Sequence, residues 1–367
     1  MKILLTSPFA HPYVRRGVER YVSELADWLT TAGHDVELLT TAPDRARREL
    51  RPSGAVVRYQ KAGRPIGSGR LRIDEVLRTA GPLWRGYMRS GTYDVIEAHH
   101  YPDGAALRAA RWRHPLAYGL WLPGVPRQSS LGRRPLNRAA ATYSMRGARR
   151  LLALSRHAAD AVSDEFGLKA EVLPPGVNTA RYAGGKPEPS GIETVLCAAA
   201  PEDPRKKVDV LVRAFEIVSK QRPQARLLLA PPRAQTAQEL VADLDDEVRQ
   251  RVTVRVPSDS NELAQMYRHA SVSVLPSVDE AFGLVLVESL ASGTPVVGTR
   301  SGGVPDVIDD EGIGRLAPPM DVDGLARAIL ETLDLALDPG SAPACRAAAL
   351  RWDWSIIGAR WLELNSP

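Results

Sequence analysis

Short apolar segments alternate with longer amphipathic segments along most of this chain, and this alternation limits the fold more than any other feature. The segment from Lys2 to Leu5 is short and apolar, and 36–39 is apolar again. Between them, VERYVSELADWLTTAG carries apolar residues at helical spacing, at Val18, Tyr21, Val22, Leu25 and Leu29. Strand–helix–strand units of this kind connect parallel strands, so the sequence predicts an α/β fold.

A break rich in proline and glycine divides the alternation into two halves. It comprises Pro174-Pro175-Gly176 and the segment GGKPEPSG, after which a strand and a helix follow again at 194–198 and 208–221. We predict a first domain over 1–183, a second over 184–350, and a C-terminal helix over 351–367 that could cross back to the first domain. Two doubly wound domains of this kind would face each other across a cleft, with ligands beyond the C-terminal ends of the strands.

The composition is that of a soluble globular protein. Of the 367 residues, 44% are hydrophobic and 25% are charged, and the net charge of +5 suits ligands that carry phosphate. Two cysteines, Cys197 and Cys345, are too few for a disulfide framework and favour a reducing cytoplasm. We expect no signal peptide and no membrane span, because no apolar run reaches roughly 18 residues.

The segment SVDEAFGLVLVESLASGTPVVG, at 277–298, holds the strongest candidate site. Glu288 lies inside an apolar stretch, where a carboxylate needs partners or loses its charge. A helix that begins at 282–284 would offer free N–H groups and a positive dipole end to a phosphate, and Gly283 would allow close approach. Glu280 precedes this helix, so one phosphate-bearing ligand with ribose hydroxyls could contact both glutamates.

This spacing resembles that of the retaining glycosyltransferases of family 4, which have the GT-B fold. The segment ASGTPVVGTRSGGVPDVI, which follows, adds to the resemblance. Four further segments resemble the family in order along most of the chain, namely RGVERYVSELADWLTTAGHDVELLT, LLALSRHAADAV, EVLPPGVNTARY and PRKKVDVLVRAFEIV. The resemblance implies two Rossmann-like domains, of which the first binds the acceptor and the second binds a nucleotide sugar.

The resemblance also implies roles for residues of the 277–298 segment. Glu288 would hold the ribose of the nucleotide. Glu280, with the backbone at Phe282 and Gly283, would contact the donor sugar. The backbone at Gly283 and Leu284 would contact the diphosphate.

Four further residues gain expected roles from the same resemblance. Lys206 and Arg205 would neutralise the diphosphate, and together with Glu280 they form the expected catalytic set. Gly17 would let the first loop approach the phosphates. The backbone near Val256 would contact the base.

The resemblance implies a reaction that retains the anomeric configuration and needs neither cofactor nor metal. The donor would be a UDP- or GDP-linked sugar, and the acceptor a small molecule or a lipid, in the synthesis of secondary metabolites, thiols or glycolipids. Two aspartate pairs, 243/245 and 321/323, have metal-like spacing, but we interpret them as solvated or helix-capping residues. We expect no nucleic-acid partner, and the oligomeric state stays open.

The chain departs from the family pattern at three points. Ala199-Ala200 stand where the family has Gly-Arg, no histidine follows the strand around 120–122, and the loop glycines are reduced to Gly17 alone. Candidate substitutes on the acceptor side are His11, Arg16, His99 and His100, each of which could equally be structural.

These departures leave alternative functions open. The enzyme could form an S- or N-glycosidic bond, or the chain could be an inactive nucleotide-binding partner subunit. A third alternative uses the stretch from Arg127 to Arg156, which has no acidic residue. We interpret that stretch as a solvated helix surface, with anionic lipid, an anionic acceptor or nucleic acid as the other interpretations.

Overall fold

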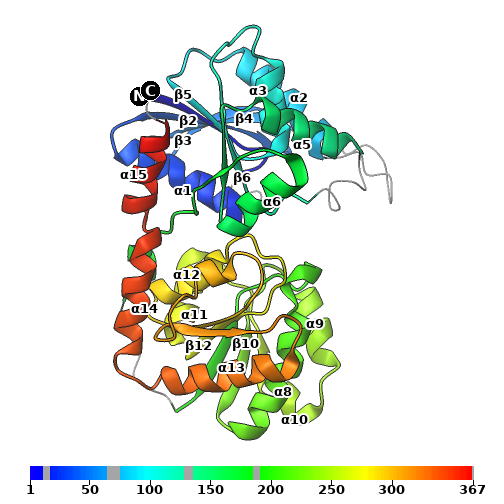
Figure 1. Ribbon diagram of the computed structural model, residues 1–367, viewed down its shortest axis with the longest axis vertical. Coiled ribbons are helices and arrows are strands. Elements are labelled where there is room, and N and C mark those ends of the chain that lie inside the picture. Colours follow the sequence, from blue (N-terminus) through cyan, green and yellow to red (C-terminus); the bar gives the residue numbers. More distant parts are fainter. Residues whose placement is uncertain (11–16, 64–74, 128–134, 185–190, 366–367) are drawn as a thin grey trace. The chain divides into compact units, whose positions relative to one another are not determined.

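The computed structural model describes residues 1–10, 17–63, 75–127, 135–184 and 191–365. It divides into two compact α/β units, each with its own sheet (Figure 1). The first unit comprises Met1–Gly176 and Ile357–Pro367, and the second comprises Val177–Ile356.

Among the described residues, the sheet of the first unit has eight strands in the order β3-β4-β2-β1-β5-β6-β7-β8. Only the edge pair β3–β4 is antiparallel, and the sequence did not indicate this hairpin. The predicted parallel arrangement is otherwise confirmed. The strands are β1 (Lys2–Thr6), β2 (Asp35–Ala42), β3 (Arg47–Leu50), β4 (Val56–Lys61), β5 (Val95–Ala98), β6 (Gly119–Leu122), β7 (Arg150–Ala153) and β8 (Glu171–Val172).

Helices connect these strands, as the sequence pattern predicts. In α1, Tyr21, Leu25 and Leu29 are buried, which confirms the predicted apolar face, and the helix ends before Gly33. The helices of the first unit are α1 (Gly17–Thr31), α2 (Glu75–Met88), α3 (Tyr101–Ala109), α5 (Pro135–Gly147) and α6 (Arg156–Phe166).

The sheet of the second unit has six strands in the described residues, in the order β11-β10-β9-β12-β13-β14, and all of them are parallel. Counted from its own first strand, this order is 3-2-1-4-5-6, that of the nucleotide-binding doubly wound fold, and the order reverses between β9 and β12. The strands are β9 (Glu193–Cys197), β10 (Ala225–Leu229), β11 (Val252–Val254), β12 (Val272–Leu275), β13 (Val296–Thr299) and β14 (Gly314–Ala317).

The helices of the second unit also follow the sequence pattern. The predicted helix over 208–221 is α8, and its apolar face, including Leu211, Phe215 and Val218, is buried. The helical elements are α7 (Thr179–Tyr182), η2 (Pro204–Lys206), α8 (Val208–Gln221), α9 (Gln235–Ala242), α10 (Asp246–Arg249), α11 (Ser260–His269), α12 (Leu284–Ala291), η3 (Val304–Asp306), α13 (Val322–Leu335), α14 (Ser341–Ala349) and η4 (Leu350–Trp352). The last helix, α15 (Trp354–Asn365), begins in this unit and continues in the first.

The units divide at Gly176, whereas the sequence predicted a boundary at 183/184. The backbone N–H of Val177 donates to Trp352 O at 2.8 Å, and Thr179 Oγ1 donates to Asp353 Oδ2 at 2.5 Å. These contacts hold the segment between the two parts of the Pro/Gly-rich break against a part of the chain more than 170 residues away. Local composition carries no signal for such a contact.

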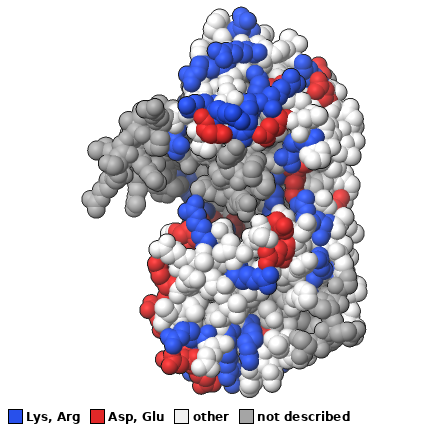
Figure 2. All heavy atoms as spheres, turned by 180° about the vertical axis from the view of Figure 1, so that it is seen from behind, with Lys and Arg blue, Asp and Glu red and all other residues white. Residues whose placement is uncertain are grey.

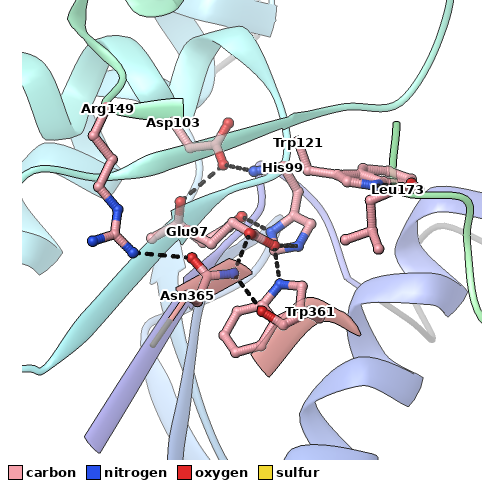
Figure 3. A network of polar contacts seen from close by, with 9 residues as sticks. Glu97, His99, Asp103, Trp121, Arg149, Leu173, Trp361 and Asn365 are labelled. Carbon is pink, nitrogen blue, oxygen red and sulfur yellow. Dashed lines mark hydrogen bonds and ion pairs between the residues drawn. The ribbon is translucent and has the colours of Figure 1, made fainter. Parts of the chain in front are cut away.

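The C-terminal helix α15 joins the first unit from Ile357 onward. Trp361 is fully buried there, and its indole Nε1 donates to Glu97 Oε1 at 2.7 Å (Figure 3). Asn365 Nδ2 approaches Glu97 Oε2 at 3.5 Å. The helix therefore contributes both apolar burial and hydrogen bonds to a carboxylate that strand β5 holds in the core.

We expect Trp361→Ala to lower the free energy of unfolding of the first unit by about 3–5 kcal/mol, because it removes a buried ring. It also leaves Glu97 without its indole donor. Trp361→Phe keeps most of the ring and loses only the N–H, so we expect a cost of about 1–3 kcal/mol. Urea unfolding, monitored by circular dichroism, measures the free energy of unfolding of both variants.

The matched control is Ile356→Ala on the same helix, where the side chain is 52% exposed. Its effect should stay within about 0.5 kcal/mol. If Trp361→Ala cost no more than this control, α15 would not be stabilising the first unit.

Candidate functional site

The residues predicted to bind the donor lie at the C-terminal edge of the second sheet. Arg205 and Lys206 follow β9, Glu280 follows β12, and Val256 follows β11. Because all strands of this sheet are parallel, their C-terminal ends share one edge. Lys206 and Glu280 stand on either side of the point where the strand order reverses, which is where doubly wound sheets bind ligands.

The backbone of Glu280 is fixed by the segment that follows β13. Gly303 N donates to Glu280 O at 2.7 Å, and Asp279 N donates to Ser301 Oγ at 2.9 Å. Gly302 has a φ of +63°, and a Cβ at this position would lie 2.1 Å from Glu280 O. Only glycine therefore fits at 302, and it brings the two loops into direct contact.

Lys206 and Glu280 form an ion pair through Nζ and Oε2. The side chain of Lys206 is 22% exposed and that of Glu280 is 14% exposed, so the pair is mostly shielded but reachable from solvent. The two loops are also joined by their backbones, because Val278 N donates to Arg205 O at 2.8 Å. The arrangement places one cation and one carboxylate side by side at the reversal point.

Arg205 has a different partner. Its Nη2 lies 2.6 Å from Asp203 Oδ2, and the hydrogen bond to Asp203 raises the pKa of Arg205. The guanidinium is about half exposed. Arg205 and Lys206 are therefore neighbours in sequence but are held by separate carboxylates.

The helix predicted after Glu280 begins at Leu284, within the expected 282–284. Gly283 is its N-cap with a φ of +102°, and Gly283 O accepts from Leu286 N at 2.9 Å. The first N–H groups of a helix point outward and carry its positive dipole end. Phe282 is 2% exposed and its ring contacts that of Trp352, with centroids 6.0 Å apart. The Phe282 side chain thus faces the core, which leaves its backbone as the part that can meet a ligand.

Glu288 is 1% exposed and accepts a hydrogen bond from Tyr267 Oη at 3.2 Å. This is the kind of partner that a carboxylate inside an apolar helix needs. Tyr267 lies on α11, and nothing in its local sequence distinguishes it from other core tyrosines. Sequence reasoning therefore missed this residue.

Val256 is 42% exposed, just past the end of β11. The preceding residue is held in place twice, because Arg255 N donates to Leu229 O at 2.9 Å and its guanidinium lies 2.5 Å from Glu262. Hydrogen bonds from Ser258 and Arg255 lower the pKa of Glu262 to about 2. The loop after β11 thus has an ordered backbone that is open to solvent at Val256.

In the first unit, the predicted residues lie beside β1 and β5, the strands between which its own order reverses. Gly17 begins α1 and is exposed. His100 is the N-cap of α3, and its ring meets the Tyr101 ring edge-on with centroids 6.1 Å apart. The candidates His11 and Arg16 lie outside the described residues.

His99 is fully buried (Figure 3). Its Nδ1 lies 3.0 Å from Thr6 O and its Nε2 lies 3.2 Å from Glu97 Oε1. The Tyr21 and Trp121 rings, which stack on each other with centroids 4.2 Å apart, lie close to the imidazole. These contacts favour the structural interpretation of His99 over a role at the acceptor.

Two buried carboxylates beside His99 were missed by sequence reasoning. Glu97 is fully buried and contacts α15 through Trp361. Asp103 accepts from Thr6 Oγ1 and from His99 N, both at 2.8 Å, and burial raises its pKa to about 7. A signal was present for Glu97, since it interrupts the apolar strand YDVIEA.

Apolar side chains occupy two of the three sites where the chain departs from the family pattern. Ala199 is 6% exposed next to β9, and Trp121 and Leu122 of β6 are buried.

Within the described residues, no cluster of three or more His, Cys, Asp or Glu side chains could hold a metal ion. The aspartate pair at 321/323 has the predicted capping role, because Asp321 Oδ1 accepts from Gly324 N at 2.9 Å. No helix in the described ranges is both long and apolar enough to cross a membrane.

Comparison with known proteins gives matches over both units. The family model for glycosyltransferase family 4 matches residues 15–181, and the model for glycosyl transferases group 1 matches residues 192–334. The chain is 30% identical to the D-inositol 3-phosphate glycosyltransferase of Streptomyces scabiei (strain 87.22), over 95% of this chain and 87% of that relative.

Solved structures show the same fold. Sucrose-phosphate synthase from Thermosynechococcus elongatus superposes with a TM-score of 0.83 at 23% identity, over 99% of this chain and 98% of that one. Anabaena HepE in complex with UDP and glucose superposes with a TM-score of 0.77 at 19% identity, over 100% of this chain and 99% of that one. The predicted GT-B fold class is confirmed. The two family models occur in the predicted order and a relative is 30% identical across nearly the whole chain, so the protein belongs to the family 4 glycosyltransferases.

Proposed function

We propose that this glycosyltransferase moves a sugar from a nucleoside diphosphate sugar to a small-molecule acceptor with retention of the anomeric configuration. The observation that carries the proposal is the Lys206–Glu280 ion pair at the reversal point of the second sheet. It lies at the same sheet edge as the N-terminus of α12. A cation and a helix N-terminus suit a diphosphate, and a carboxylate suits sugar hydroxyls.

In this proposal the diphosphate binds at the backbone of Gly283 and Leu284, next to Lys206. A lysine about 4 Å from a phosphate charge contributes on the order of 4 kcal/mol at an effective dielectric constant near 20. When Lys206 turns to the diphosphate, Glu280 becomes free to accept hydrogen bonds from the donor sugar. Arg205 is a second cation for the diphosphate and would have to leave Asp203.

The nucleoside would contact Glu288 through its ribose and the backbone near Val256 through its base. A UDP-linked donor agrees with the UDP bound by HepE, and GDP is the alternative. Glu288 is 1% exposed, so ribose binding requires the groups that cover it to move. A variant of its partner Tyr267 can therefore separate a ribose-binding role from a purely structural one.

The proposed reaction needs neither a metal nor a covalent enzyme intermediate. The bond between the anomeric carbon and the phosphate oxygen breaks, and the bond to the acceptor oxygen forms on the same face of the sugar. The acceptor proton passes to the leaving phosphate. Lys206 stabilises the charge that grows on this phosphate as the bond breaks, which is the kind of interaction that accelerates a reaction.

The acceptor would bind in the first unit, near Gly17, with His100, His11 and Arg16 as candidate contacts. The relatives named D-inositol 3-phosphate glycosyltransferase suggest a phosphorylated polyol as the first acceptor to test. Cys197 and Cys345 are both buried and form no disulfide with a described residue, which agrees with a reaction in the reducing cytoplasm.

We expect one of UDP, GDP and ADP to raise the melting temperature, and Lys206→Ala and Glu288→Ala to abolish most of that rise. At a ligand concentration of 100 Kd the gain is about 2.7 kcal/mol, which corresponds to roughly 5–10 °C for a unit of this size. Differential scanning fluorimetry measures the shift.

The matched charge control is Lys207→Ala, the neighbouring lysine, which should keep the full shift. Tyr267→Phe removes the partner of Glu288 without removing the carboxylate, so it should also keep the shift. If Tyr267→Phe lost it as completely as Glu288→Ala, the carboxylate would be structural. If no nucleotide raised the melting temperature of wild type, the proposed donor site would be refuted.

We expect Glu280→Gln and Lys206→Ala to lower kcat by about 10²–10³, because each removes charge that acts in the transition state. The kcat of the control variant Lys207→Ala should stay near that of wild type. Transfer is followed with phosphorylated polyols, thiols and amines as acceptors, and NMR identifies the product anomer. An anomer inverted relative to the donor, or activity lost with EDTA and restored by a divalent metal, would contradict the mechanism.

Nucleotide binding without turnover of any donor would favour the other open possibility, a nucleotide-binding partner subunit. The specific observation behind that possibility is Ala199-Ala200, which leaves the first loop of the second unit without the arginine that the family usually has there. A thiol or amine acceptor would instead support S- or N-glycosidic bond formation.

A further inference from the structure

Helices α3 and α5 form a basic surface on the first unit that the proposed reaction does not use. They pack against each other (Figure 1), and Ser144 Oγ of α5 donates to Tyr101 O of α3 at 2.5 Å. The whole segment from 104 to 159 contains no aspartate or glutamate. In the view from behind, Lys and Arg side chains predominate over the upper part of the molecule, whereas basic and acidic side chains are mixed lower down (Figure 2).

A shallow groove of about 690 Å³ lies between the two helices, lined by Arg108, Arg138, Ala139, Thr142, Tyr143 and Arg146. Arg108 Nη1 donates to Tyr143 O, and its guanidinium lies 4.1 Å from the centre of the Tyr143 ring. Three arginines and two side chains with hydroxyl groups, Thr142 and Tyr143, therefore line a space that could hold a phosphate group. Guanidinium groups bind phosphate oxygens through paired hydrogen bonds.

The arginines of this groove lack carboxylate partners among the described residues, unlike the arginines at the two ends of the same basic stretch. Arg127 lies 3.9 Å from Glu165 and Arg150 lies 3.0 Å from Glu171. Arg108, Arg138 and Arg146 form no such pair with any described residue. Carboxylates of the described residues thus leave the positive charge of the groove unneutralised.

Three large apolar or aromatic side chains of the same stretch are exposed. Trp112 is 75% exposed, Leu136 is 59% exposed and Tyr143 is 43% exposed. Leu136 and Tyr143 are seven residues apart on α5, so they lie on one face of the helix. Arg146 follows Tyr143 by three residues and lies next to it on the helix surface. Trp112 follows Arg108 by four residues and lies between Arg111 and Arg113. Exposed tryptophan and leucine next to arginine are typical of surfaces that enter a lipid interface.

We propose that the α3–α5 surface docks on a membrane that contains anionic phospholipid. A lipid phosphate would occupy the arginine-lined groove, while Trp112 and Leu136 would enter the boundary between head groups and acyl chains. Each arginine near an anionic leaflet strengthens binding about fivefold. Nucleic acid explains the charges but gives no role to Leu136, and one tryptophan offers no series of stacking surfaces.

This inference stands apart from the proposed transfer reaction, because docking requires neither donor nor acceptor. The test uses the full chain and co-sedimentation with vesicles that mix phosphatidylglycerol with phosphatidylcholine, at low and at physiological salt. Pure phosphatidylcholine vesicles form the second arm. We expect binding to the anionic vesicles, weakened by salt, and little binding to the neutral ones.

The variant Arg138→Glu/Arg146→Glu should lower the partition coefficient at least tenfold. Its matched control is Arg213→Glu/Arg327→Glu, which makes the same change of charge at exposed positions on α8 and α13. The control should stay within about twofold of wild type, since attraction to an anionic surface falls off within a Debye length. The variant Trp112→Ala/Leu136→Ala should have a partition coefficient several-fold lower than wild type at physiological salt, where charge attraction is weaker.

Three results would overturn the proposal. The first is no sedimentation of wild type with anionic vesicles at low salt, and the second is an equal loss in both charge-reversal variants. The third is full displacement by glycerol 3-phosphate or single-stranded DNA with no effect of Trp112→Ala/Leu136→Ala, which would indicate a site for soluble anions. If circular dichroism showed the charge-reversal variant to be unfolded, Arg138→Gln/Arg146→Gln should still give a smaller loss.

Discussion

The parallel pairing of β9 with β12 is the constraint on which the second unit depends. Val195 pairs with Val272 and Leu196 with Ser273, although these residues are more than 75 positions apart. Because the two strands run side by side, the loops at their C-terminal ends meet, and Lys206 reaches Glu280. The charge pair at the proposed donor site is thus a consequence of strand order.

Glycine completes this arrangement where two backbones touch. Gly302 allows the segment after β13 to contact Glu280, and a Cβ there would overlap the Glu280 carbonyl oxygen. Gly283 begins α12 in a left-handed conformation that other residues rarely adopt. Three loops from three neighbouring strands can therefore converge without a bulky side chain between them, which leaves room for a ligand to meet backbone N–H groups.

In the first unit, the titratable groups at the end of the central strand are buried in the core, whereas the ion pair of the second unit is partly exposed. Glu97, His99 and Asp103 lie in its core at or near the end of β5, and Thr6, Trp361 and Asn365 supply hydrogen bonds to them. Burial alone would make these carboxylates costly, so the stability of the unit rests on the partners that arrive from distant parts of the chain. The outer surface of α3 and α5 carries arginines that form no ion pair with a described carboxylate, which suits it to an anionic ligand.

The sequence by itself determined the local elements and the family. Periodicity predicted α1 and α8, because burial of one helical face leaves a mark at every third or fourth residue. The motif around Glu280 and Glu288 identified the edge of the sheet that carries the candidate site. Only the tertiary structure decided which groups meet: that Lys206 pairs with Glu280, that Tyr267 holds Glu288, and that α15 buries Trp361 against Glu97. These contacts join residues between about 20 and 260 positions apart, and local patterns hold no information on pairs at such separations.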